Sequence, residues 1–165
     1  MTASSKLRAP ELLGQPRSRY QIDCAGAQLN VHTRSQATVL RIDGEIDASN
    51  AELVIQAIRH FSRLRAPLIL DLGGLDFIGG AGLRELLNLR DEHRKSQVYC
   101  GMVGGLALRR ITQLLPDHGL PMVDSVADAL GYIEDVIRAR RRFVSGPARQ
   151  HEPQHRATAW VDGVA

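Results

Sequence analysis

The stretch APLILDLGGLDFIGGAGLRELLNL, residues 66–89, decides the fold of this chain. Its first part, residues 67–72, is a short and almost unbroken apolar run, which is typical of a parallel strand that is covered on both faces. Glycines follow at positions 73, 74, 79, 80 and 82 and predict a glycine-rich turn. From Leu83 onward the apolar residues fall three and four positions apart. This spacing predicts an amphipathic helix that begins at the glycines and runs to about residue 95.

A strand, a turn and a helix in this order place the N-terminus of the helix at the end of a sheet, where the strand ends. The first backbone N–H groups of a helix have no partner within the helix, and they carry a partial positive charge. In open α/β sheets, ligands and partners bind at this edge. We therefore expect the functional surface of the chain at the glycine-rich turn.

The remaining segments predict a small α/β domain. Two strands, at residues 28–32 and 38–42, are joined by a short polar turn and predict an antiparallel hairpin. Ser49 and Glu52 then have the spacing of a capping box at the start of a helix. Further strands are expected at residues 97–103 and 120–123, and further helices after residue 105 and after Ser125. This order indicates a mostly parallel, α/β sheet of four to five strands with four helices, entered by an antiparallel hairpin.

Charge is distributed unevenly along the 165 residues, of which 44% are hydrophobic. Residues 1–20 carry +3 and residues 141–165 carry +2 of a net charge of +3, so residues 21–140 carry −2. The basic balance therefore comes from the ends and argues against nucleic acid as a partner. We expect a mobile basic arm over residues 1–20, a folded domain over 21–142 and a disordered tail over 143–165.

Two cysteines and the lack of long apolar runs bear on the compartment. No stretch approaches the roughly 20 apolar residues of a membrane span, and the N-terminus lacks the apolar region of a secretory signal. We therefore expect a cytoplasmic protein without a membrane partner. Cys24 and Cys100 are too few and too far apart for a disulfide framework or a zinc site. A buried, inert Cys100 is favoured, and a redox switch between the two thiols stays open.

Three patterns bear on catalysis. Residues 151–155 match the H-E-x-x-H pattern of zinc peptidases, but Pro153 would break the helix that this pattern requires. Residues 74–80 have the spacing of a phosphate-binding loop without its lysine. Between Arg63 and Lys95 there is no serine, threonine, cysteine or tyrosine, so the turn lacks a nucleophile. We therefore expect no enzyme, no metal and no cofactor.

Residues 40–47, LRIDGEID, and 75–83, LDFIGGAGL, resemble stretches of the STAS domain of bacterial anti-sigma factor antagonists. The resemblance covers about residues 27–138 and includes the order of the elements, so it implies a STAS-like fold. It also implies that the chain binds an anti-sigma factor of the serine kinase type and frees a sigma factor, as in the regulation of transcription under stress. In that family, phosphorylation of one serine at the start of the second helix ends the binding.

The family's phosphorylation motif differs in this chain. The pattern is Asp-Ser-Ser-Gly, or Thr for Ser, and it is set here against Gly79, Gly80, Ala81 and Gly82. Gly80 therefore stands at the phosphorylated serine and cannot be modified. A phosphate brings about −1.5 to −2 charges into an interface and breaks it by repulsion and desolvation. The resemblance thus implies an antagonist without the usual off-switch.

We expect the partner to bind at the turn, at the exposed side of the helix after it, and at the adjacent helix start. The residues are Asp47, Ser49, Gly79, Gly80, Ala81, Gly82, Arg84 and Asn88. Two other functions stay open. One is a sensor that holds a small anion or nucleotide at the same helix N-terminus, and the other is a scaffold subunit of a larger signalling or transport assembly. A homodimer also stays open.

Overall fold

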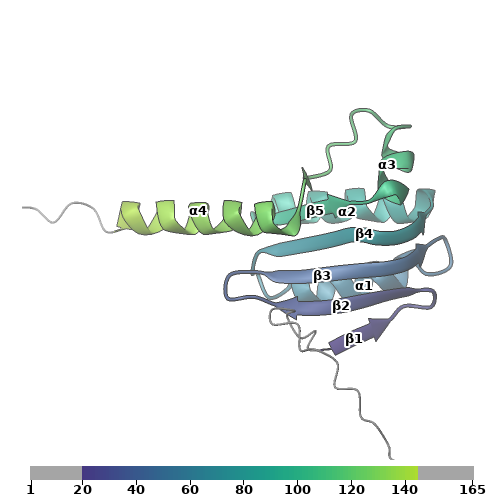
Figure 1. Cartoon of the computed structure of the whole chain (residues 1–165), viewed down its shortest axis with the longest axis horizontal. Coiled ribbons are helices and arrows are strands. Elements are labelled where there is room, and N and C mark those ends of the chain that lie inside the picture. Colours follow the sequence, from purple (N-terminus) through teal and green to yellow (C-terminus); the bar gives the residue numbers. More distant parts are fainter. Residues whose placement is uncertain (1–19, 145–165) are drawn as a thin grey trace, which may run out of the picture.

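The central stretch of the sequence forms the centre of the sheet and one of its covering helices (Figure 1). In the computed structural model, which describes residues 20–144, β4 runs over Leu68–Ile78 and α2 over Gly80–Ser96. β4 therefore continues through Gly73 and Gly74, where the sequence predicts a turn. The register against β3 shifts by one residue beside these glycines, so they occupy a bulge within a long strand.

The sheet has six strands, and their order in space follows their order in the chain. The elements beside β4 and α2 are β1 (Tyr20–Asp23), β2 (Ala27–Thr33), β3 (Thr38–Ile46), α1 (Ala51–Ser62), β5 (Cys100–Gly104), α3 (Leu106–Thr112), β6 (Met122–Val123) and α4 (Val126–Val144). β1, β2 and β3 pair antiparallel, and the pairs from β3 to β6 are parallel. The α/β class, the antiparallel entry, the four helices and the edge position of the last strand are thus confirmed.

The predicted number of four to five strands is too low by the short strand β1. This strand has four residues, of which Tyr20 is the last residue of the predicted arm and the other three belong to the predicted domain. So short a segment shows too few alternations to be recognised as a strand. The rest of the predicted arm, the predicted tail after α4 and the H-E-x-x-H match lie outside the described residues. α4 continues to Val144, two residues past the predicted end of the domain.

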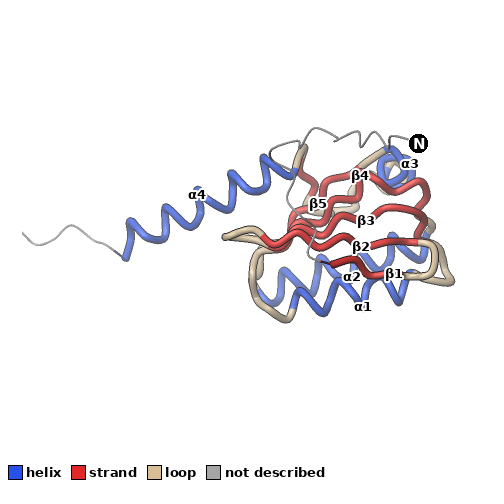
Figure 2. The backbone as a smooth tube through the Cα atoms, turned by 60° about the horizontal axis from the view of Figure 1, so that its bottom comes forward, coloured by secondary structure: helices blue, strands red, loops and turns tan. Residues whose placement is uncertain are grey.

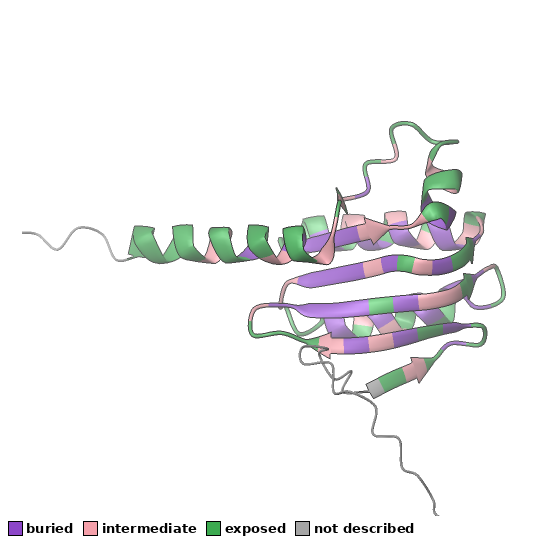
Figure 3. Cartoon of the chain, viewed as in Figure 1, coloured by how far each residue is buried: buried purple, intermediate pink, exposed green. Residues whose placement is uncertain are grey.

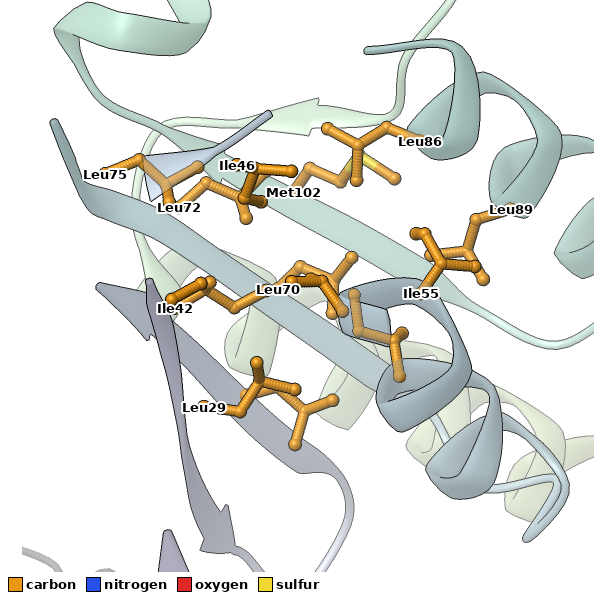
Figure 4. Packing of buried hydrophobic residues seen from close by; sticks show 14 of the residues in the cluster. Leu29, Ile42, Ile46, Ile55, Leu70, Leu72, Leu75, Leu86, Leu89 and Met102 are labelled. Carbon is orange, nitrogen blue, oxygen red and sulfur yellow. The ribbon is translucent and has the colours of Figure 1, made fainter. Parts of the chain in front are cut away.

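Helices α1 and α2 cover one face of the sheet (Figure 2). The main core lies between them and the strands and is filled by aliphatic side chains (Figure 4). The labelled members are Leu29, Ile42, Ile46, Ile55, Leu70, Leu72, Leu75, Leu86, Leu89 and Met102. β4 is buried over most of its length, as Figure 3 shows, because it lies at the centre of the sheet. The predicted apolar run is therefore confirmed as a strand covered on both faces.

Within residues 20–144, the other face of the sheet is covered in part, by the first half of α4. Ala129 and Ile133 of this helix pack with Val39 and Ile69 of the sheet in a second, smaller core. Beyond this contact α4 projects past the end of the sheet (Figures 1 and 2). Because β3, β4 and β5 are parallel, their carboxyl ends lie together at the opposite end of the sheet, where α1, α2 and α3 begin.

Candidate partner-binding site

The connection between β4 and α2 is a single residue, Gly79. β4 ends at Ile78, which pairs with Ile46 at the end of β3. The N–H of Gly79 donates a 2.8 Å hydrogen bond to the carbonyl oxygen of Ile46, and the carbonyl of Gly79 accepts one of 3.0 Å from the N–H of Leu83. Gly79 is therefore tied to both β3 and the first turn of α2. The turn is ordered by the fold before any partner binds.

Two glycines in the first turn of α2 have opposite surroundings. A Cβ atom at Gly82 would lie 2.8 Å from Cγ2 of Ile46 and 2.9 Å from Cγ1 of Ile78, so the helix approaches the strands too closely for a side chain. A Cβ atom at Gly80 would have no heavy atom within 4 Å, and Gly80 is exposed. Packing thus requires glycine at position 82 and accepts other residues at position 80.

The start of α2 presents backbone donors without a neutralising side chain. Gly79 is the N-cap and supplies no side-chain hydrogen bond, and the first turn of α2 holds no acidic residue. The first N–H groups of a helix point along its axis and carry partial positive charge. The surface at Gly80 and the half-buried Ala81 therefore offers hydrogen bonds and positive potential to a partner.

The loop between β3 and α1 lies beside this turn, because Asp47 directly follows Ile46, whose carbonyl oxygen accepts the hydrogen bond from Gly79. Asn50 is buried and organises the loop with its amide. Its Oδ1 accepts a 2.9 Å hydrogen bond from the N–H of Asp47, and its Nδ2 donates to the carbonyl oxygens of Ala25 at 3.1 Å and Glu45 at 2.8 Å. The loop is thus fixed to β3 and to the β1–β2 turn.

The predicted capping box of Ser49 and Glu52 is wrong. α1 begins at Ala51 with Asn50 as its N-cap, and the cap has no side-chain hydrogen bond. Ser49 instead donates from its N–H, at 2.7 Å, and from its hydroxyl to Oδ1 of Asp47. These two donors lower the pKa of the Asp47 carboxyl, with the hydroxyl as the larger cause. Asp47 is therefore an ionised, positioned acceptor beside Gly79.

Arg84 and Asn88 lie along α2 at successive four-residue steps from Gly80, and all three are exposed. Because residues four apart share one face of a helix, they form a strip that starts at the turn. Phe77 adds an apolar group that the sequence did not single out. Its side chain is 49% exposed, and its ring lies 3.4 Å from the position of a Cβ at Gly79. An aromatic residue directly before the predicted glycine-rich turn is the feature of the sequence that could have identified Phe77 as part of the site.

The predicted binding residues thus lie on one end of the domain. The structure brings together Asp47, Ser49, Gly79, Gly80 and Ala81 at the carboxyl ends of β3 and β4. Gly82 belongs to the packing beneath this surface. Among residues 20–144 no group of three or more His, Cys, Asp or Glu side chains is placed to hold a metal ion. In this arrangement the surface can offer backbone donors, a carboxylate and an aromatic ring to a protein partner.

A family model, the STAS domain, matches residues 28–115. The chain belongs to the STAS domain family. This confirms the resemblance on which the predicted fold and binding surface depend.

Relatives of this STAS domain include a curated protein and solved antagonists. Osmosensory protein A of Mycobacterium tuberculosis is 35% identical over 128 residues, which cover 74% of this chain and 81% of that protein. An anti-sigma factor antagonist from Mycobacterium paratuberculosis is 29% identical with a TM-score of 0.57, over 66% of this chain and 95% of that one. SpoIIAA, in its unphosphorylated form, has 18% identity and a TM-score of 0.50 over 68% and 96% of the two chains, and it shows the likeness of fold alone.

The two cysteines of this STAS domain are separate, buried thiols. Cys24 follows β1 and Cys100 lies in β5, so three strands lie between them. At about 4.8 Å per strand step, they are much further apart than the roughly 7 Å between Cα atoms that a disulfide allows. Burial raises the pKa of the Cys100 thiol to about 12, and burial followed by the charge of Asp23 raises that of Cys24. A redox switch formed by this pair therefore does not fit the fold.

None of the helices in residues 20–144 combines the length and the apolar character that crossing a membrane requires. The largest apolar faces of α1 and α2 are instead turned toward the sheet and are buried there.

Proposed function

We propose that this chain is a non-enzymatic protein-binding module that binds an anti-sigma factor of the serine kinase type and so releases a sigma factor in the cytoplasm. Membership of the STAS family supports this function, as does the likeness to an anti-sigma factor antagonist at 29% identity over 95% of that chain. The proposed contact surface is the end of the domain where α2 begins.

The observation that carries the proposal is the open position of Gly80. Gly80 is exposed, lies at the uncapped start of α2, and has no heavy atom near the site of a side chain. A partner can therefore approach the backbone closely there. Since glycine has no hydroxyl, no phosphate can be attached, and the interface stays free of the repulsion and desolvation that a phosphate brings. The antagonist is thus proposed to act without the usual off-switch.

The neighbouring groups suit a protein interface. Phe77 supplies exposed aromatic area, and aromatic residues are enriched among the side chains that dominate binding energy. Asp47 and Arg84 supply charges of opposite sign on either side of the turn, which favour one orientation of the partner. Because the Gly79 backbone is already held by its bond to Ile46, binding costs little additional ordering of the turn.

The test is a calorimetric titration of the full chain against the anti-sigma factors encoded in the same genome. The variant Gly80→Glu places a carboxylate in the proposed interface, and the open surroundings of Gly80 leave the fold intact. We expect wild type to bind and Gly80→Glu to weaken binding at least about tenfold, because an unpaired charge is desolvated.

Gly131→Glu is the matched control. Gly131 is also an exposed helical glycine with no heavy atom within 4 Å of an added Cβ, but it lies in α4, away from the start of α2. This variant should bind as wild type does. Equal loss of affinity in both variants would contradict the proposed binding surface. Binding by Gly80→Glu as tight as by wild type would contradict it as well.

A second candidate function is signalling in response to osmotic conditions, favoured by the 35% identical relative named Osmosensory protein A. In that role the N-terminus of α2 would hold a small anion or nucleotide. A ligand that binds the folded state raises the unfolding temperature, by an amount that grows with the logarithm of one plus the ratio of its concentration to its dissociation constant. Thermal melts with phosphate, ATP and GTP would show such a shift. Unchanged melting temperatures with all three would exclude them as ligands.

A further inference from the structure

Helix α4 projects from the domain for much of its length (Figures 1 and 2). Its 19 residues span about 28 Å, but its only buried side chains are Ala129 and Ile133 in the first half. Every residue from Arg138 to Val144 is exposed. Within the described residues, the last seven residues of this helix thus have no tertiary support.

The apolar stripe of α4 continues into the projecting half. Ile133, Ile137, Arg140 and Val144 follow one another at steps of four, three and four residues, which is the spacing of a helix seam that meets another helix, and Phe143 lies beside this seam. Ile133 and Ile137 take part in the second core, whereas Phe143 and Val144 are 88% and 89% exposed. This stripe therefore begins against the sheet and ends in solvent, with Arg140 as its one charged member.

A groove runs beside the middle of this stripe, between α4 and the end of the sheet at which β4 and β5 begin. Its volume is about 440 Å³, and its apolar lining includes Tyr99, Ile133, Val136 and Ile137. The ring of Tyr99 packs against that of Tyr132 with centroids 5.3 Å apart and forms one side. Arg65, Arg94 and Arg140 also line the groove, and their alkyl stems can cover apolar surface while the guanidinium groups reach solvent. The groove has the size and lining to receive an aromatic side chain.

The charges of α4 reverse along its length. The first two thirds hold acidic side chains and the last third holds basic ones. They are Asp128, Glu134 and Asp135, followed by Arg138, Arg140, Arg141 and Arg142. Glu134 and Arg141 are seven residues apart and therefore lie on the same flank of the seam. When two such helices pair antiparallel, Glu134 of each faces Arg141 of the other, so the surface is complementary to itself.

We propose that α4 is a self-association surface through which two copies of this chain pair antiparallel. Phe143 and Val144 of each copy fill the groove beside Ile133 of the other, and the Glu134 and Arg141 side chains pair across the two-fold axis. The groove and its occupant both lie on one chain, as an isologous dimer requires. The N-termini of α2 lie at the far ends of the sheets and stay open, so the dimer presents two partner-binding surfaces.

The test is sedimentation velocity of the full chain, with reductant, at concentrations from about 1 to 100 μM, where an interface of modest area associates. We expect a monomer–dimer equilibrium in this range. Phe143→Lys should raise the dissociation constant at least about tenfold, because it removes the aromatic ring and places a positive charge beside Arg65, Arg94 and Arg140, which line the groove. At concentrations well below the dissociation constant, its circular dichroism and melting temperature should be those of wild type, since Phe143 is exposed in the single chain.

Exchanging the charges at positions 134 and 141 tests this particular interface, because only here do the two side chains face each other. Glu134→Arg should weaken the dimer by like-charge repulsion, and the double variant with Arg141→Glu should restore it. Leu114→Glu is the control, because Leu114 is 79% exposed and lies after α3, outside the proposed interface. A monomer at all concentrations would overturn the proposal. So would a dimer that is insensitive to Phe143→Lys, or one that the double variant fails to restore.

Discussion

Gly82 packs so closely on Ile46 that a Cβ atom on the glycine would lie 2.8 Å from Cγ2 of the isoleucine. Gly80, two residues earlier, has open space. We therefore expect Gly82→Ala to lower the free energy of unfolding by about 1–3 kcal/mol through overpacking. Gly80→Ala should raise it by about 0.4–1 kcal/mol, because alanine restricts the unfolded chain. Urea unfolding of both variants measures the difference, and two effects of the same sign would contradict the assigned packing.

Asn50, rather than Ser49, is expected to stabilise the start of α1. Asn50→Ala removes three hydrogen bonds in a buried site, which are made with backbone groups of Ala25, Glu45 and Asp47. We therefore expect the free energy of unfolding to fall by about 2–3 kcal/mol. Ser49→Ala removes one exposed hydroxyl and should change stability by no more than about 0.5 kcal/mol. Denaturant unfolding of the two variants checks the ranking. A larger loss of stability from Ser49→Ala than from Asn50→Ala would contradict this ranking and support the capping box that the sequence predicts.

Cys100 is expected to be unreactive in the folded protein. Burial raises its pKa from 9.0 to about 12, so at pH 8 its thiolate fraction is about 10⁻⁴. The pKa of Cys24 is raised as well. A thiol-specific disulfide reagent at pH 8 should therefore label the native protein slowly and label two thiols per chain at once in denaturant. Rapid labelling of either thiol in the native state would show that it is accessible.

Gly80→Ser should recreate a phosphorylatable site at the start of α2. The open surroundings of Gly80 accept the hydroxymethyl group without a change in packing. Incubated with ATP and the cognate anti-sigma factor kinase, this variant should gain one phosphate and lose affinity, whereas wild type should gain none. Gly131→Ser, in α4, serves as the control for a new serine elsewhere. If Gly80→Ser is not phosphorylated by a kinase that binds it, the proposed orientation of the partner is wrong.

The elements with strong periodicity were predictable from the sequence. The apolar run of β4 and the helix α2 are both observed. The glycines at 73–74 were misread, because a bulge and a turn use the same residue type. The bulge depends on how β3 and β4 pair, and that pairing is not encoded in local sequence.

The candidate site was predictable in position and less so in detail. The edge at which α2 begins follows from the strand–turn–helix order. The role of Asn50 was missed because a serine with a glutamate three residues later is the commoner cap, while two of the Asn50 hydrogen bonds reach carbonyl groups five and 25 residues earlier in the chain. The different roles of Gly80 and Gly82 depend on tertiary contacts with Ile46 and Ile78.

The most direct test of the central claim is a titration of the wild-type chain into its anti-sigma factor before and after prolonged incubation of the mixture with ATP. The account predicts the same dissociation constant in both, with no phosphate on the chain by mass spectrometry. Loss of binding together with phosphorylation of the chain would contradict it. So would the absence of binding heat with every anti-sigma factor of the genome at concentrations up to about 100 μM, where even weak pairs register.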